Sequence, residues 1–268
     1  MTLVFYCRIN SLDGYNAIAL NPPVKASKRP NFSGFTLVEL LVVIAILAVL
    51  ATVGLTVGPR MMARGKATKS IENLRQIGPL FAIYAADHSM KIPPAKATTI
   101  QQDGTTKDVL WHETCLTLLF PKTDPDEFKT EEWWKRNDTF LRNPLFETSA
   151  KPRGWEPLNP GYAINEMIPE NLALASTGTI PSHDELLSSS VPLAALGDPG
   201  RTPLIAPCDN YFFRYDRDQI KEFENGTLKD LLIEGKVPIL FVDGHVESIR
   251  PTEYIARKLY LVPIVPGP

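Results

Sequence analysis

An apolar run near the amino end constrains the fold of this chain more than any other feature. As an α-helix, the 23 residues 35–57 would extend about 35 Å, enough to cross a hydrocarbon core of about 30 Å. A soluble helix is rarely so long and so apolar on every face. The run contains four polar residues, Thr36, Glu39, Thr52 and Thr56. The sequence therefore predicts a membrane-spanning helix over residues 35–57.

A cleavable secretory signal is the main alternative for this run. Its apolar region is usually 7–15 residues long and ends at a small-x-small site. The run here is longer, and Gly34 precedes it rather than follows it. We therefore expect the segment to stay on the mature chain as an anchor.

Basic residues on both sides of the run bear on its orientation. The preceding group predicts that the amino-terminal side stays in the cytoplasm; it comprises Lys25, Lys28 and Arg29. A second basic group follows the run, so the charge bias is not one-sided; it comprises Arg60, Arg64, Lys66 and Lys69.

The single carboxylate in the run, Glu39, has an energetic cost. A carboxylate near one end of a spanning helix costs about 2–3 kcal/mol on insertion scales, and such residues usually pair with another group. An acid that reaches the interface or takes up a proton, with no partner, is the structural alternative.

The motif GFTLVE at residues 34–39 resembles the start of type IV prepilins and type II secretion pseudopilins. These families share a short basic leader, a glycine, Phe-Thr-Leu-(Ile/Val)-Glu and an apolar helix. The resemblance implies that a prepilin peptidase cuts between Gly34 and Phe35 and methylates the new amino group of Phe35. It also implies that Glu39 faces the amino-terminal amine of a neighbouring subunit during assembly. The leader, residues 1–34, is longer than is common in these families.

The remainder of the chain predicts a helical spine and a head. Residues 58–92 continue the helix with an amphipathic face, formed by Ile71, Leu74, Ile77, Phe81 and Tyr84. Gly-Pro pairs at 58–59 and 78–79 predict kinks or a break. Residues 93–268 are predicted to form a loop-rich α+β head. The resemblance implies a pilin-like α+β fold, with the long helix packed on a small antiparallel sheet.

Three sequence signals predict local structure within the head. Asp124-Pro125 predicts the start of a short helix that continues through two tryptophans. Residues 203–207 predict a strand. Asp243-Gly244 predicts a type I′ turn between strands at 237–242 and 245–249.

The carboxyl-terminal hairpin resembles a pseudopilin-like group known for an H-X9-DG motif. The segments 73–95, GYAIN (161–165) and FVDGHVE (241–247) follow the order of that group. The leading histidine of the motif is missing, because Ile233 stands ten residues before Asp243.

Cysteine pairing has two interpretations. Removal of residues 1–34 takes away Cys7 and leaves Cys115 and Cys208. An isolated pair in an exported domain is a candidate disulfide, and two separate buried thiols are the alternative.

The sequence offers little support for catalysis or cofactor binding. Residues beyond 34 carry 24 basic and 29 acidic side chains, which argues against a nucleic-acid partner. No GxSxG, P-loop or GxGxxG motif occurs, so neither an enzyme nor a cofactor is predicted. Asp124, Asp126 and Glu127 lack EF-hand spacing, and helix capping is preferred over calcium binding there, so no metal is predicted.

The sequence therefore predicts a structural subunit. By the resemblance, its partners are other pilin-like subunits, the prepilin peptidase and an inner-membrane assembly platform. The expected location is the bacterial inner membrane, crossed once, with a periplasmic carboxyl-terminal head that becomes part of a filament. A membrane-anchored binding module that never polymerises is the alternative, and an exported hydrolase ranks last.

Overall fold

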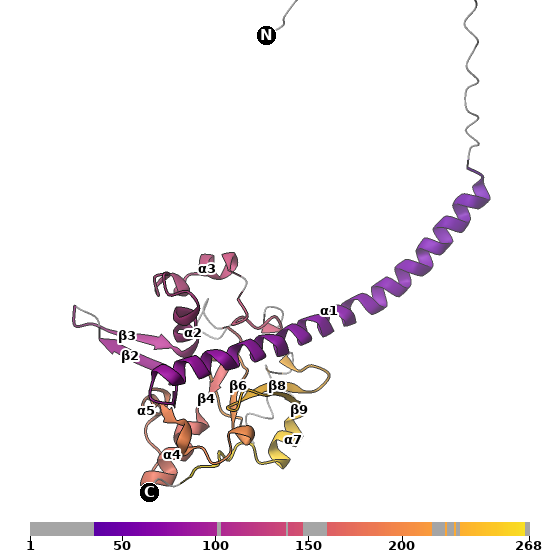
Figure 1. The fold of residues 1–268 in the computed structure, drawn as a ribbon. Helices are drawn as coiled ribbons and strands as arrows, with labels where there is room; N and C mark the ends of the chain where they lie inside the picture. The colour runs from indigo at the N-terminus through magenta and orange to yellow at the C-terminus, as the bar shows by residue number, and fades with distance from the viewer. Residues whose placement is uncertain are drawn as a thin grey trace, which may run out of the picture. The chain divides into compact units, whose positions relative to one another are not determined.

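The computed structural model describes most of the chain beyond the predicted leader (Figure 1). The leader, with Gly34 and Cys7, lies outside the described residues, which are 35–100, 103–137, 139–146, 160–215, 223, 228 and 231–265. The chain divides into two compact units, Met1–Thr52 and Val53–Pro268.

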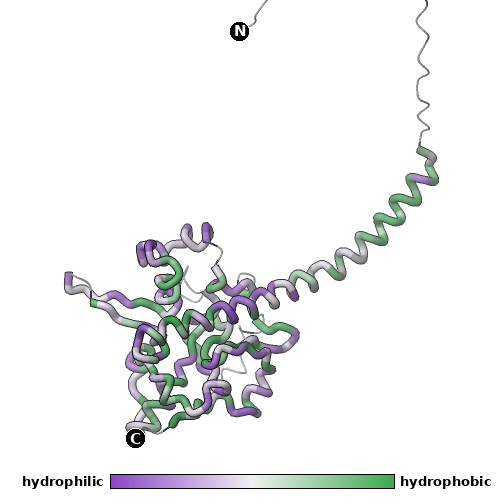
Figure 2. Tube along the Cα trace, viewed as in Figure 1, coloured by the Kyte–Doolittle hydropathy of each residue, from purple (hydrophilic) through white to green (hydrophobic). Residues whose placement is uncertain are grey.

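A single helix, α1 (Leu37–Asp87), is the longest element, with 51 residues. Its first half is almost uniformly hydrophobic and its second half is mixed (Figure 2). The helix is continuous through both Gly-Pro pairs, so the break considered at 78–79 does not occur. Gly78 lies against the head, where an added Cβ would be 3.4 Å from Cδ1 of Leu240.

The second half of α1 buries one face against the head. Leu74, Ile77 and Phe81 are buried as the periodicity predicts, while Ile71 and Tyr84 are half-buried at its margins. Smaller side chains extend the buried stripe, namely Ala67, Ser70 and Ala85. Tertiary burial of one face is the main source of stability for such a helix.

A five-stranded sheet with the order β7-β4-β6-β8-β9 forms the centre of the head. Its neighbouring strands are antiparallel except for β4 and β7, which are parallel. The strands are β4 (Tyr162–Asn165), β6 (Pro203–Pro207), β7 (Phe212–Phe213), β8 (Val237–Phe241) and β9 (Val246–Ile249). The expected strand at 203–207 is therefore found, in the middle of the sheet.

The described residues of the head also form two small sheets and several short helices. The two-stranded sheets pair β1 (Lys91–Ile92) with β5 (Val191–Pro192), and β2 (Lys96–Ile100) with β3 (Thr106–Leu110). The α-helices are α2 (Trp111–Leu119), α3 (Glu131–Arg136), α4 (Met167–Thr177), α5 (His183–Leu187) and α7 (Pro251–Ala256). The 3-10 helices are η1 (Glu127–Lys129), η3 (Leu193–Ala195) and η4 (Pro199–Arg201). This architecture confirms the predicted α+β class, with a long amino-terminal helix and small, mainly antiparallel sheets.

The helix expected from Asp124-Pro125 begins later than predicted. Helix α3 is capped by Thr130, whose Oγ1 accepts a hydrogen bond from the backbone N–H of Trp133 at 3.3 Å. The side chain of Asp124 instead accepts the backbone N–H of Asp126 at 2.9 Å. An aspartate that bonds two residues ahead stabilises a turn in competition with a helix, which accounts for the displaced start.

Candidate assembly site at the start of the long helix

The carboxylate of Glu39 stabilises the first turn of its own helix. Its Oε2 accepts the backbone N–H of Thr36 at 2.8 Å and the hydroxyl of Thr36 at 2.9 Å. In return, Oγ1 of Thr36 accepts the backbone N–H of Glu39 at 3.2 Å. This reciprocal arrangement is a capping box, which satisfies N–H groups that a helix start leaves without intrahelical partners.

The expectations from sequence did not include this cap. The signal was present, because Thr36 and Glu39 have the Thr-x-x-Glu spacing of a capping box. Both hydrogen bonds from Thr36 end on Oε2, and Oε1 of Glu39 accepts none from any described residue. A positive group on another molecule can therefore approach Oε1 without disrupting the cap.

Apolar side chains around this turn are uncovered. Phe35 is 82% exposed, and the large apolar side chains from Leu37 to Val57 are 44–80% exposed wherever the structure describes them. Exposed apolar surface of this extent marks a site of contact with lipid or protein. Over the described residues, no helix is long and apolar enough to qualify as a membrane span. The span at residues 35–57 remains a prediction from sequence.

The hairpin at Asp243-Gly244 is present, but its turn differs from the predicted one. Strands β8 and β9 pair antiparallel, with Leu240 opposite Val246. Gly244 has a φ of +91°, whereas Asp243 is not among the residues with positive φ. A type I′ turn requires positive φ at both central residues, so the prediction of that type is wrong. The loop instead has three residues, 242–244. Within it, the backbone N–H of Gly244 donates to the carbonyl of Phe241 at 3.0 Å.

Asp243 organises this loop through its contacts with His245. Its Oδ1 accepts the backbone N–H of His245 at 3.1 Å and lies 2.6 Å from Nδ1 of the same histidine. Partial burial raises the pKa of Asp243, but the hydrogen bonds from His245 outweigh it and hold the pKa below its usual value. The imidazole stacks on Phe241 with ring centroids 4.3 Å apart. The arrangement is that of a side-chain-supported turn.

The segment GYAIN contains strand β4, and its side chains contact helix α1 and strand β6. Gly161 has a φ of +74°. The hydroxyl of Tyr162 lies 3.0 Å from Oγ of Ser70 on α1, in the buried interior. The amide of Asn165 donates to the carbonyl of Pro203 at 2.8 Å. These contacts hold helix α1 and the neighbouring strand β6 against β4.

The candidate disulfide between Cys115 and Cys208 is not formed, and both residues are free thiols. Each is fully enclosed, but in a different apolar cluster: Cys115 packs with Trp111 and Leu74, whereas Cys208 packs with Phe213 and Tyr215. Burial raises the pKa of each thiol to about 12. The two separate buried thiols considered from sequence are what the structure contains.

Polar groups elsewhere in the head have structural explanations. His112 is 1% exposed, and burial lowers its pKa to about 3, so the ring is neutral. Glu113 accepts the backbone N–H of Leu110 at 2.9 Å. Asp126 is bonded to the ammonium of Lys107, which occupies the carboxylate considered for calcium. Within the described residues, no group of three or more His, Cys, Asp or Glu side chains is placed to hold a metal ion.

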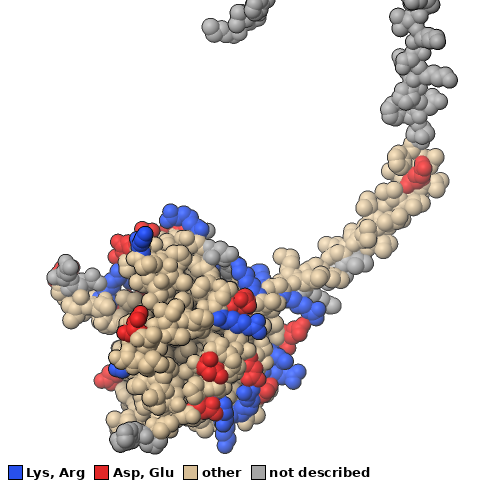
Figure 3. All heavy atoms as spheres, in the orientation of Figure 1, with Lys and Arg blue, Asp and Glu red and all other residues tan. Residues whose placement is uncertain are grey.

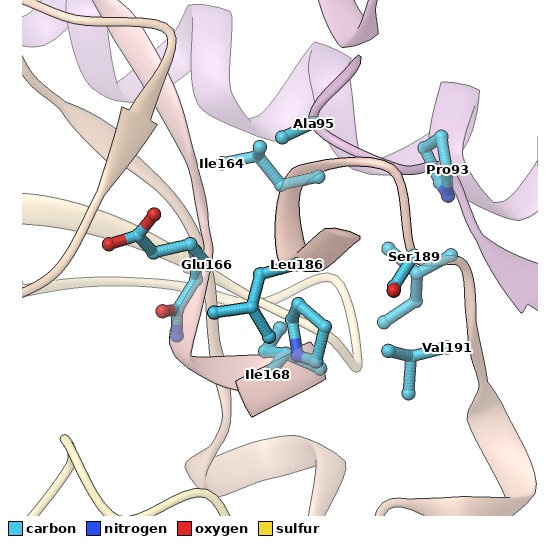
Figure 4. A pocket seen from close by; sticks show the side chains of 11 residues that line it. Pro93, Ala95, Ile164, Glu166, Ile168, Leu186, Ser189 and Val191 are labelled. Atoms are coloured by element: carbon cyan, nitrogen blue, oxygen red, sulfur yellow. The ribbon is translucent and has the colours of Figure 1, made fainter. Parts of the chain in front are cut away.

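A small cavity beside Glu166 is too confined to be a ligand site (Figure 4). Its volume of about 10 Å³ is near that needed for one water molecule. Apolar side chains such as Ile168, Leu186 and Val191 form most of its wall. The buried carboxylate of Glu166 is paired with Nε of Arg214 at 2.8 Å.

Comparison with known proteins bears on the amino-terminal site. The family model of the prokaryotic N-terminal methylation motif matches residues 29–55, which include Thr36 and Glu39. The match supports a type IV pilin-like protein. That motif family is structural rather than enzymatic. The match does not extend to the hairpin that resembles the H-X9-DG group. Comparisons with curated proteins and with solved structures found no match.

Proposed function

We propose that this chain is a pilin-like structural subunit of a type II secretion pseudopilus or a type IV pilus-like filament. A prepilin peptidase cuts between Gly34 and Phe35 and methylates the amino group of Phe35. The observation that carries the proposal is the methylation-motif match at residues 29–55, within which the Glu39 carboxylate lies one helical turn from the new amino terminus.

The proposal places the chain in the bacterial inner membrane. Residues 35–57 cross the membrane once, the head lies in the periplasm, and an inner-membrane platform assembles the subunits. Support for the span comes from sequence, namely 23 residues with one carboxylate as their only charge. Nearly uniform exposure of the apolar side chains in this half of α1 is consistent with a lipid or protein surrounding.

Glu39 then docks one subunit on the next. Its Oε2 stays in the cap with Thr36, and Oε1 accepts the methylated amine of a neighbouring Phe35, which remains positively charged. A carboxylate in an apolar surrounding is costly unless it is paired. Pairing across subunits removes that cost only in the assembled state, so the charge favours assembly over the isolated protomer.

Three variants test this assignment. Gly34→Ala should leave an uncut precursor. Glu39→Gln keeps an acceptor oxygen for the Thr36 N–H but removes the charge, so it should be cut yet enter filaments poorly. Thr36→Ala is the matched control, because it removes the hydroxyl from the cap and keeps the charge. It should be cut and assembled nearly as the unchanged chain.

Two measurements read out these variants. Mass spectrometry of the membrane form should find N-methylated Phe35 as the first residue, and an intact Met1 there would count against processing. Shear-released filaments report incorporation. Normal assembly of Glu39→Gln would exclude the docking role, and a binding module that never polymerises would show no filaments even from the unchanged chain.

A further inference from the structure

A run of positive charge follows the apolar part of α1, and the proposed function does not explain it. The run comprises Arg60, Arg64, Lys66 and Lys69, and residues 40–71 contain no aspartate or glutamate. Under the proposed topology these cations lie on the translocated side, where the positive-inside rule disfavours them. A specific partner on that side would compensate for this disadvantage.

The side chains of the run that the structure describes are exposed or half-buried. Arg64 is 74% exposed as a side chain and pairs with Glu234 at 3.0 Å, but a pair so exposed contributes little. Lys69 is exposed and Lys66 is half-buried. Figure 3 shows a stretch of α1 without basic side chains, and basic side chains together with acidic ones where this stretch ends.

Two apolar side chains are interleaved with the cations. Met61 and Met62 are 67% and 69% exposed, although both sit on an element that has a buried face further along. Exposed apolar residues alternating with cations are typical of helices at the boundary between headgroups and acyl chains. Lys and Arg place their charged ends in the headgroup layer while their aliphatic stems stay in apolar surroundings.

The spacing along the helix suits a lipid surface. Arg60 to Lys69 lie 3 to 12 residues beyond residue 57, which is about 5–18 Å along the helix axis. The headgroup layer on each side of a bilayer is about 5–8 Å thick, and the field of its charges extends a further 8–10 Å at physiological salt. The cations therefore fall within the layer or within its field.

We propose that residues 60–69 bind the anionic phospholipid headgroups of the leaflet on the head side. The inference rests on the proposed function, since it requires residues 35–57 to be in the membrane. Headgroup phosphates supply negative charge opposite the exposed cations of the run, and Met61 and Met62 enter the acyl boundary beside them.

Energy transfer to labelled lipids tests this. A donor dye is attached to Ala63→Cys in the full chain with Cys7→Ser, since Cys115 and Cys208 are buried. The chain is reconstituted in phosphatidylcholine vesicles with a trace of acyl-labelled acceptor, either phosphatidylglycerol or phosphatidylcholine. The charge variant is Lys66→Gln with Lys69→Gln. Its matched control removes two exposed lysines of the head, Lys91→Gln with Lys122→Gln.

Around the dye, the density of the phosphatidylglycerol acceptor should exceed that of the phosphatidylcholine acceptor several-fold. The reason is that each lysine near an anionic surface raises the affinity about fivefold. High salt should reduce this ratio. The Lys66/Lys69 variant should bring the ratio towards one, while the control should keep it. Equal densities around a chain that floats with the vesicles would overturn the inference and leave the proposed anchor intact.

Two further results would also overturn it. Full enrichment in the Lys66/Lys69 variant would show that these cations do not select lipid. If the Lys66/Lys69 variant keeps its ratio of phosphatidylglycerol to phosphatidylcholine density but no longer self-associates, the run instead binds an acidic surface of a second copy. Failure of the unchanged chain to float with any vesicle would contradict the proposed membrane anchor itself.

Discussion

At the scale of single residues, Gly161 is the most constrained position in the GYAIN segment. Its φ is +74°, and an added Cβ would lie 2.5 Å from Cβ of Phe146 and 2.9 Å from Cβ of Asn143. Neither neighbour can move away by rotating a side chain, because both clashes involve Cβ atoms. A glycine in this family-like segment is therefore explained by space and backbone conformation together.

Gly161→Ala should destabilise the chain by about 2–4 kcal/mol, from left-handed strain together with overpacking. Gly178→Ala is the matched control, since Gly178 has a φ of +72° but open space around it. The control should cost only about 1 kcal/mol. Denaturant unfolding of the detergent-solubilised chain measures both, and equal losses would show that the contacts with Phe146 and Asn143 carry no cost.

His112 should make stability depend on pH. Its pKa is about 3 in the folded protein against an ordinary value of 6.5, so the unfolded chain binds the extra proton first. Between these values, stability should fall by about 1.4 kcal/mol for each unit that the pH decreases, and the contribution is fully present only above pH 6.5. Burial raises the pKa of Glu113, which gives an opposite slope above its ordinary value.

The comparison of variants isolates the histidine from Glu113. His112→Leu should flatten the dependence of the unfolding free energy on pH between 3 and 6.5, whereas the unchanged chain should retain it. An unaltered pH profile in His112→Leu would contradict the assignment of a neutral buried ring.

At the scale of elements, the carboxyl-terminal hairpin shows what a dipeptide signal can decide. Asp-Gly fits a two-residue type I′ loop and also a three-residue loop whose last residue has positive φ. Register decides between them: here Leu240 pairs with Val246, and the N–H of Phe241 donates to the carbonyl of His245 at 2.9 Å, which leaves three residues, 242–244, in the loop. A two-residue turn does occur just before β8, at Glu234-Gly235, with φ values of +51° and +76°. Glutamate is uncommon at a position with positive φ, so the residues Glu234-Gly235 did not predict this turn.

The side chain of Asp243 should matter to this hairpin through its acceptor oxygen. Asp243→Ala removes the hydrogen bond to the backbone N–H of His245 and should cost about 0.5–1.5 kcal/mol. Asp243→Asn retains a carbonyl oxygen at the same place and should cost less. Thermal unfolding distinguishes them. A larger loss in the asparagine variant would mean that the charge, and not the acceptor, supports the loop.

Helix α1 could be predicted in more detail than the head. A repeat of three or four residues identified Leu74, Ile77 and Phe81 as buried, and the structure confirms them. Local signals also placed β6, but the start of α3 at Glu131 depends on competition between Asp124 and Thr130, which propensity alone does not resolve. The capping role of Thr36 was missed because Thr36 and Glu39 belong both to the prepilin-like motif and to the Thr-x-x-Glu pattern of a capping box, and the motif alone was considered.

At the scale of the whole molecule, the fold class could be predicted from the sequence, but the order of the strands in the sheet could not. A long helix followed by short strands and frequent turns indicates α+β. Strand order depends on contacts far apart in sequence: β6 lies between β4 and β8, and β7 joins β4 in parallel. No local pattern encodes such neighbours. Nor could sequence decide between a disulfide and two thiols, because the choice depends on whether two distant positions meet.

The thiols give a prediction for the whole chain. Because Cys115 and Cys208 are buried, free and have a pKa of about 12, a reductant should not change the unfolding midpoint of the processed protein. Alkylation of these two residues should require opening of the fold, so it should accelerate only in denaturant. Mass spectrometry after denaturing alkylation should count three labels on the precursor and two on the processed chain, since Cys7 leaves with residues 1–34. A midpoint lowered by reductant, or a denatured processed chain that takes no label without reduction, would instead show that the two cysteines pair.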